Sequence, residues 1–137
     1  MKYKNILLVN DDSDHAEDFV TALNAINQKI ISSVESSALE ALKKLRDSKL
    51  APDMIFLDYH MPYFDGTEFL KLLRDIKALR KIPVILYSKH SGGMLKDSLD
   101  TFKGVQFLKK QGNFSKLTEV LRNVIVPEQS VKNTKSP

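Results

Sequence analysis

Four short apolar runs of this chain each end at polar residues that can take part in phosphate chemistry. The run ILLV precedes Asn10 and Asp11, MIFL precedes Asp58, VILY precedes Ser88, and VQFL precedes Lys109 and Lys110. If these runs are parallel strands of one sheet, the polar residues meet at its carboxyl edge, where open α/β sheets bind ligands. We therefore expect a phosphoacceptor site at that edge.

The chemistry expected at this edge is transfer of a phosphoryl group to a carboxylate. Asp11 and Asp58 would repel each other, and a divalent cation relieves that repulsion; the chain has no cysteine, so oxygen ligands and Mg²⁺ are favoured. A carboxylate is deprotonated at neutral pH and can attack phosphorus without a general base. Asp58 is the preferred nucleophile because its strand is the more central one. Ser88 and a lysine of the last run would hold phosphoryl oxygens.

Strand and helix signals alternate five times along the chain. Apolar runs predict strands over residues 6–9, 29–34, 54–57, 83–87 and 105–108. Apolar residues at helical spacing predict a helix after each strand: one capped by Ser13 or Asp14, one from a capping box at Ser37 and Glu40 to about Ser48, one over 67–80, one over 91–102, and one capped by Ser115. Gly92 and Gly93 each weaken the fourth helix by about 1 kcal/mol relative to alanine, so it should be the least rigid.

This alternation predicts a three-layer, doubly wound α/β fold with a five-stranded parallel sheet. The flavodoxin-like strand order 2-1-3-4-5 fits best, because it makes the four strands that end in chemical groups neighbours. We expect one domain over residues 1–126 and a flexible tail over 127–137, which has a single apolar side chain, Val131.

Composition indicates an ordinary globular domain of 137 residues with a net charge of +4. No apolar stretch approaches the roughly 20 residues that cross a bilayer, so we expect a cytoplasmic protein without a membrane partner. The basic residues are dispersed, and those of the third helix are expected to form a solvated face: Lys71, Arg74, Lys77, Arg80 and Lys81. No nucleic-acid recognition motif accompanies them, so nucleic acid is not an expected partner.

The ordered set of motifs resembles the receiver domain of response regulators, the phosphoacceptor module of two-component signalling. The resemblance covers residues 4 to about 126 and depends on LLVNDD, LDYHMPYFDG, ILYS and FLKK. Each motif alone is weak, but their order and spacing together are specific. The resemblance implies roles for particular residues: Asp58 as the phosphorylated aspartate, Asp11, Asp58 and the backbone carbonyl of His60 as Mg²⁺ ligands, Ser88 as the switch hydroxyl, Lys110 as the phosphate-binding lysine, and Phe107 as the switch aromatic.

The resemblance also implies a function. Such domains receive a phosphoryl group from a histidine kinase or a histidine phosphotransfer protein, and phosphorylation switches binding to a downstream protein. The chain is therefore expected to act as a single-domain response regulator. It would not be an enzyme in the ordinary sense, although it would assist its own phosphorylation and dephosphorylation.

Several positions depart from the family pattern. Asn10 replaces the first residue of the acidic pair and removes a charge, which Asp12 could restore although the corresponding family position usually points elsewhere. Lys89 stands where the family more often has a small residue, so we expect altered dephosphorylation. Gln111 replaces the proline after Lys110; the preceding bond is cis in many relatives, and cis before a non-proline residue costs about 3 kcal/mol.

Two other functions remain open at this point. One is a phosphorylation-independent pseudo-receiver that acts as an interaction module, which the residues Asn10, Lys89 and Gln111 favour. The other is a metal-dependent phosphohydrolase with an aspartyl nucleophile. Such enzymes commonly carry a second acid two residues after the nucleophile, and here that residue is His60.

Overall fold

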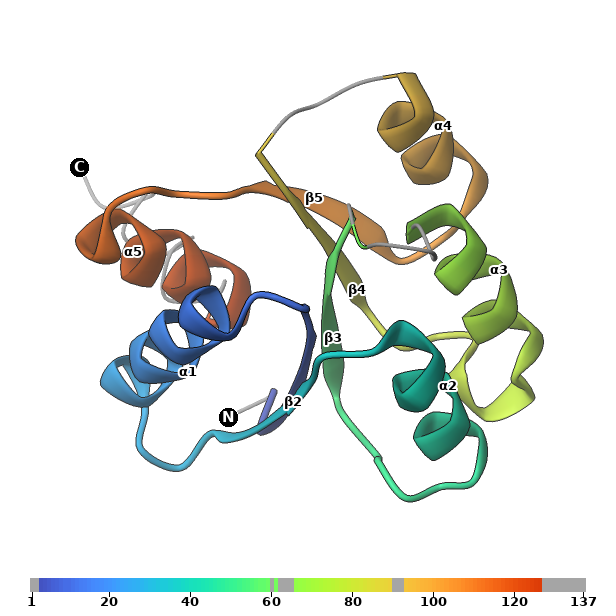
Figure 1. The fold of residues 1–137 in the computed structure, drawn as a ribbon, viewed down its shortest axis with the longest axis horizontal. Helices are drawn as coiled ribbons and strands as arrows, with labels where there is room; N and C mark the ends of the chain where they lie inside the picture. Colours follow the sequence, from blue (N-terminus) through green and yellow to red (C-terminus); the bar gives the residue numbers. More distant parts are fainter. Residues whose placement is uncertain (1–2, 60, 62–65, 90–92, 127–137) are drawn as a thin grey trace.

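The computed structural model describes residues 3–59, 61, 66–89 and 93–126, which form a parallel sheet between two layers of helices (Figure 1). The strand order is β2-β1-β3-β4-β5, which confirms the predicted order. The strands are β1 (Asn5–Val9), β2 (Ile31–Glu35), β3 (Met54–Asp58), β4 (Val84–Ser88) and β5 (Val105–Lys109). The helices are α1 (Ser13–Ile26), α2 (Ala38–Arg46), α3 (Gly66–Asp75), α4 (Gly93–Thr101) and α5 (Phe114–Ile125), with a 3₁₀ turn η1 (Lys77–Leu79). The predicted tail, 127–137, lies outside the described residues.

Each face of the sheet packs against its own helices. Helices α1 and α5 lie on one side, and α2, α3 and α4 lie on the other (Figure 1). Every residue of β3 and β4 is buried. Strands covered on both faces are expected to be continuously apolar rather than alternating. This double burial explains why the apolar runs of the sequence located the strands so well.

Two helices begin earlier than predicted. Asp12, rather than Ser13 or Asp14, caps α1: it has extended backbone angles, and its carboxylate accepts a hydrogen bond from the His15 N–H at 3.1 Å. Asn113, rather than Ser115, caps α5 in the same way through the Lys116 N–H at 3.1 Å. A cap must lie just outside the first helical turn. Ser13, Asp14 and Ser115 are already helical, so their side chains cannot fill that position.

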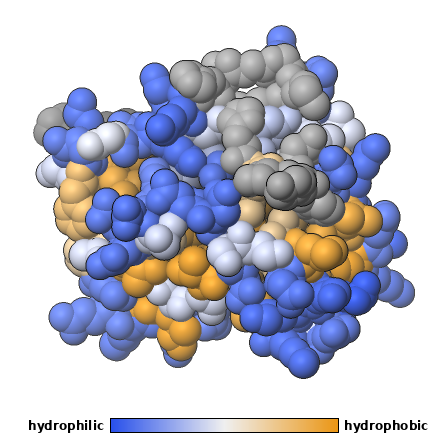
Figure 2. All heavy atoms as spheres, in the orientation of Figure 1, coloured by the Kyte–Doolittle hydropathy of each residue, from blue (hydrophilic) through white to orange (hydrophobic). Residues whose placement is uncertain are grey.

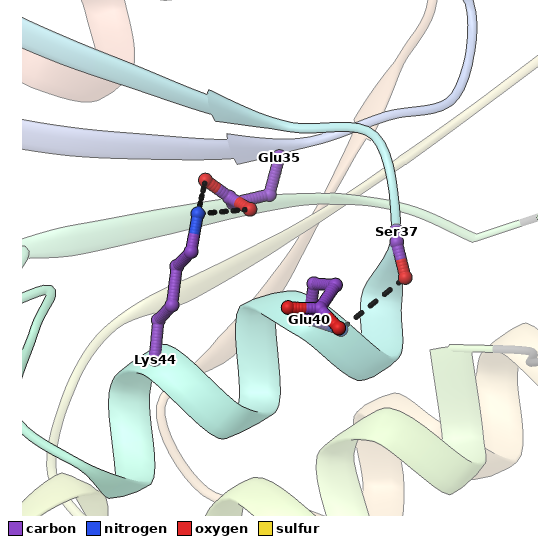
Figure 3. A network of polar contacts seen from close by, with 4 residues as sticks. All are labelled: Glu35, Ser37, Glu40 and Lys44. Carbon is purple, nitrogen blue, oxygen red and sulfur yellow. Dashed lines mark hydrogen bonds and ion pairs between the residues drawn. The ribbon is translucent and has the colours of Figure 1, made fainter.

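The predicted cap of α2 is confirmed. The Ser37 hydroxyl accepts a hydrogen bond from the Glu40 N–H at 3.2 Å (Figure 3). Further along the helix, Lys44 Nζ lies 3.1 Å from both carboxylate oxygens of Glu35 (Figure 3). This ion pair ties the helix to the carboxyl end of the edge strand β2.

The helix predicted over residues 67–80 is wrong beyond Asp75. Helix α3 ends at Asp75, Ile76 is extended, and η1 follows. Arg74, expected on a solvated face, is partly buried and donates hydrogen bonds to the carbonyls of Leu79, Ile82 and Lys103, each at 2.9 Å. Burial lowers the pKa of this guanidinium from its usual value. Arg74 therefore fastens the chain between α3 and β4, and the start of β5, in place of a longer helix.

Replacing Arg74 with methionine should destabilise the fold by about 2–4 kcal/mol, because three carbonyls lose charge-assisted donors while the side chain keeps its bulk. Urea unfolding measures this loss. Lys71→Met is the matched control on the exposed side of the same helix and should change stability by less than about 0.5 kcal/mol. Equal losses of stability from Arg74→Met and Lys71→Met would show that the hydrogen bonds of Arg74 do not stabilise the fold.

The surface has no single dominant apolar face in the view shown. Hydrophobic residues form separate patches among hydrophilic ones (Figure 2). The most exposed large apolar side chains among the described residues lie on β2, α2, α3 and α5: Ile31, Val34, Leu39, Leu72 and Phe114. None of the helices described has both the length and the apolar character needed to cross a membrane.

Candidate functional site

Asp58 lies at the end of the central strand β3 and is only 4% exposed. The Nζ of Lys110, just after β5, lies 3.1 Å from Asp58 Oδ1. The two side chains are 12% and 6% exposed, respectively. An ion pair that is largely shielded from water interacts more strongly than one on the surface. The sheet thus brings together a carboxylate and an ammonium that are 52 positions apart by residue number.

The end of β5 decides which of two adjacent lysines reaches Asp58. Lys109 is the last residue of β5, is paired in register with Ser88, and is exposed. Lys110 donates its backbone N–H to the Ser88 carbonyl at 2.8 Å, and its side chain turns to Asp58. No peptide bond among the described residues is cis, so the bond between Lys110 and Gln111 is trans. The hydroxyl residue Ser88 is fully buried at the end of β4, one residue beyond the partner of Asp58 in the sheet.

The end of β1 presents Asn10 and Asp11. Asn10 is 1% exposed; its N–H donates to the Glu35 carbonyl at 3.0 Å, and its Oδ1 accepts from the Asp12 N–H at 2.8 Å. Its Nδ2 is buried and has no hydrogen-bond partner among the described residues. Asp11 is exposed. The amide at position 10 therefore offers a donor at the site, where a carboxylate would offer an acceptor.

Asp12 is the N-cap of α1, so its carboxylate does not replace the charge that is missing at Asn10. Its carboxylate accepts the His15 N–H at the start of α1, and this bond is the main reason why its pKa is lowered from the ordinary value. A carboxylate at a helix N-terminus is further favoured by the helix dipole. The structure thus accounts for Asp12 as an N-cap.

The donor set at this edge fits a magnesium ion. Val9 of β1 is level with Leu57 of β3, so Asp11 and Asp58 follow their strands at the same edge. Mg²⁺ commonly uses one or two carboxylates and keeps several waters. The unpaired Asn10 Nδ2 can donate to such a water or to a phosphoryl oxygen. Within the described ranges, no cluster of three or more His, Asp or Glu side chains could hold a metal by itself.

Two further predicted site residues, Phe107 and Lys89, can be placed in the structure, and a third, His60, cannot. Phe107 is partly buried and packs against the core on the side of α3 and α4. Lys89 is exposed directly after Ser88, and with Lys109 and Lys110 it lines a cavity of about 630 Å³. His60, whose carbonyl was predicted to bind the metal, lies outside the described residues.

A chain of three hydroxyls leads away from Asp58 and was not predicted. Tyr59, the next residue, has its hydroxyl 3.1 Å from the Thr67 Oγ1 of α3, which is 2.8 Å from the Ser98 Oγ of α4. Ser98 is 2% exposed. A Cβ on Gly66 would lie 2.5 Å from the Tyr59 ring, so glycine is needed for this close packing. Tyr59, α3 and α4 are therefore connected by partly buried polar contacts.

Tyr87 is a second buried tyrosine at this edge. It is fully buried in β4, with its ring edge-on to Phe19 at 5.8 Å between centroids. Burial raises the pKa of its hydroxyl, and the charge of Asp58 adds to the rise, whereas a hydrogen bond from the Gln111 backbone N–H acts in the opposite direction. The phenol therefore remains protonated through the neutral range.

The raised pKa of Tyr87 should make the fold sensitive to alkali. The folded state favours the neutral hydroxyl, so this contribution is intact below the ordinary pKa of 10.0 and is lost as pH rises above it. The loss should be about 1.4 kcal/mol for each pH unit above 10. Urea unfolding of the parent and of Tyr87→Phe from pH 8 to 12 measures it. A parent curve that falls no more steeply than that of the variant would contradict the prediction.

Comparison with known proteins identifies the class of protein that this fold and site define. The sequence matches the response regulator receiver domain over residues 6–122, and the chain belongs to this family. Receiver domains are signalling domains of two-component systems, for which phosphorylation and Mg²⁺ binding are general. Receiver domains of response regulators interact with histidine kinases or phosphotransfer proteins and with downstream targets.

Two curated relatives show how much sequence is shared. The two-component response regulator-like protein APRR3 of Arabidopsis thaliana is 31% identical over 121 residues, which are 88% of this chain and 24% of that protein. The polar-differentiation response regulator DivK of Brucella ovis is 34% identical over 82 residues, which are 60% of this chain and 63% of DivK. The matches thus span less than two thirds of either relative.

The fold is also that of solved receiver structures. The phosphorylated cyanobacterial phytochrome response regulator RcpA is 24% identical and superposes with a TM-score of 0.76 over 89% of this chain and 91% of its own. This similarity supports the fold alone. The five-stranded, flavodoxin-like architecture predicted from the sequence is therefore confirmed twice, by the topology and by the comparison.

Proposed function

We propose that this chain accepts a phosphoryl group on Asp58 from the phosphohistidine of a histidine kinase or a histidine phosphotransfer protein. Phosphorylation then changes its binding to a downstream protein, in the manner of a single-domain response regulator. The observation that carries the proposal is the contact of 3.1 Å between Lys110 Nζ and Asp58 Oδ1 at the carboxyl edge of the sheet. Ser88, at the end of the adjacent strand, is the expected switch hydroxyl.

The transfer is a displacement at phosphorus. An oxygen of the Asp58 carboxylate forms the new O–P bond, the P–N bond of the donor breaks, and its electron pair returns to the imidazole nitrogen. The carboxylate needs no general base. Lys110 donates N–H groups to the developing charge on the phosphoryl oxygens. Asp11 and Asp58, with the His60 carbonyl, would hold the Mg²⁺ that, when bound, offsets charge on the transferring group.

Asn10 supports a second candidate function, that of a phosphorylation-independent interaction module. Its amide removes one carboxylate from the site, and its Oδ1 already accepts the Asp12 N–H. Fewer anionic ligands weaken the binding of a hard cation. On this alternative the same fold would bind a partner without any adduct on Asp58.

Intact-mass analysis with acetyl phosphate and Mg²⁺ separates the two candidates. We expect the mass to increase by one phosphoryl group, and we expect no increase when EDTA is present from the start. Peptide mapping should place the phosphoryl group on Asp58. The phosphate-free chain treated in parallel is the reference for partner binding. Absence of an adduct with acetyl phosphate and with a phosphohistidine donor would reject the phosphoacceptor function and favour the interaction module.

A further inference from the structure

Tyr87 contacts the functional lysine with its ring. Lys110 Nζ lies over the Tyr87 ring, 5.5 Å from its centroid, and 3.1 Å from Asp58 Oδ1. An ammonium within about 6 Å of an aromatic centroid is attracted to the ring face. The lysine is therefore held between a carboxylate and a ring that comes from the neighbouring strand.

The Tyr87 hydroxyl is tied to the first turn of α1. It lies 3.0 Å from Nε2 of His15, in the first turn of α1, and the two rings meet edge-on at 5.3 Å between centroids. Whichever tautomer His15 adopts, this contact fixes the oxygen to α1. The backbone N–H of Gln111 also acts on this hydroxyl, where it opposes the rise in pKa that burial causes.

Packing alone does not require a hydroxyl at this position. The neighbouring aromatic residues of the same core, Phe19 and Phe56, fill their places with plain rings. A phenylalanine at position 87 would bury the same ring without a polar atom that must find partners. The buried oxygen is explained by its contact with His15 of α1, which holds the ring in place under Lys110.

We propose that Tyr87 is a positioning residue for Lys110. Its hydroxyl anchors the ring to His15 of α1, and the ring supports the ammonium, so that Lys110 Nζ stays directed at Asp58. The inference rests on the proposed function, because it assigns a role within the same site. Tyr87 acts through Lys110 and does not touch the phosphoryl group itself.

A double-mutant cycle tests the inference. Tyr87→Phe should slow phosphorylation of Asp58 by acetyl phosphate about five- to thirty-fold, the effect of losing one or two kcal/mol of anchoring. In a Lys110→Ala background, Tyr87→Phe should change the rate less than about twofold, because Tyr87 then has no lysine to position. A small donor is used so that docking of a protein partner plays no part.

Two matched variants separate positioning from general loosening of the fold. Tyr59→Phe removes another buried tyrosine hydroxyl at this edge, one directed to Thr67, and should leave the rate within about twofold. His15→Gln retains a side chain that can meet the Tyr87 hydroxyl and should keep more activity than His15→Ala. Equal slowing by Tyr87→Phe with and without Lys110, or equal slowing by Tyr59→Phe, would overturn the inference.

Nuclear magnetic resonance gives a readout that does not depend on phosphorylation. Tyr87→Phe should shift the Gln111 amide and the Lys110 side-chain resonances, whereas Tyr59→Phe should leave both in place. If the parent forms no adduct, the proposed function fails, and these resonances alone decide whether Tyr87 positions Lys110. Unchanged Lys110 resonances in Tyr87→Phe would refute the positioning role in either case.

Discussion

An Asp58→Asn variant is expected to take up no phosphoryl group from acetyl phosphate or from a phosphohistidine donor. The amide lacks the anionic oxygen that forms the bond to phosphorus, and Asp58 is the carboxylate that pairs with Lys110 among the described residues. Because asparagine has nearly the same shape, the variant should keep its fold. Intact mass after incubation with donor and Mg²⁺ measures the uptake, and circular dichroism checks the fold.

Asp53→Asn is the matched control for this substitution. Asp53 is a partly buried aspartate just before β3, at the opposite end of the strand from Asp58, and it accepts the backbone N–H groups of Lys4 and Asn5. Its replacement should reduce stability without reducing phosphoryl uptake. Persistent phosphorylation of Asp58→Asn would mean that the acceptor lies elsewhere in the chain.

Lys110→Ala is expected to slow phosphoryl uptake by about 10²- to 10³-fold, the effect of removing one donor that is directed at developing charge. Its ammonium is the cation that the structure places against Asp58. Quenched mass spectrometry over time, with acetyl phosphate in excess, gives the rate. Partner binding that depends on phosphorylation should weaken as well, because the lysine stabilises the charged adduct.

Lys109→Ala provides the control for Lys110→Ala. The adjacent lysine carries the same charge but is exposed at the end of β5. Its removal should change the rate less than about threefold, through long-range electrostatics only. A larger effect of Lys109→Ala than of Lys110→Ala would show that Lys109, and not Lys110, is the phosphate-binding lysine.

The sheet could be predicted from the sequence because the buried strands of this fold are continuous apolar runs. β3 and β4 are buried on both faces, so their apolar runs are uninterrupted, and a polar residue directly after such a run marks the sheet edge. Asp58 and the pair Lys109 and Lys110 could be predicted to be neighbours because parallel strands end at one edge. The choice of Lys110 within that pair came from the resemblance to receiver domains.

Features that depend on side-chain partners far apart in the sequence could not be predicted. The pattern of α3 continues past Asp75, and only the bonds from Arg74 to carbonyls beyond the helix show why the helix ends there. No role was predicted for Tyr87 within ILYS, and His15 lies outside the four motifs, although the two side chains meet beside the site. Capping was misplaced by one or two residues at α1 and α5, since several polar residues compete for each N-terminus.

The hydroxyl contacts from Tyr59 through Thr67 to Ser98 oppose movement of α4 away from α3. Moving α4 away from α3 must break the contact of 2.8 Å between Thr67 and Ser98, which is partly buried. Losing one such hydrogen bond costs about 0.5–1.5 kcal/mol. Displacement of α4 therefore has an energetic cost, and the contacts that impose it begin at the residue after Asp58.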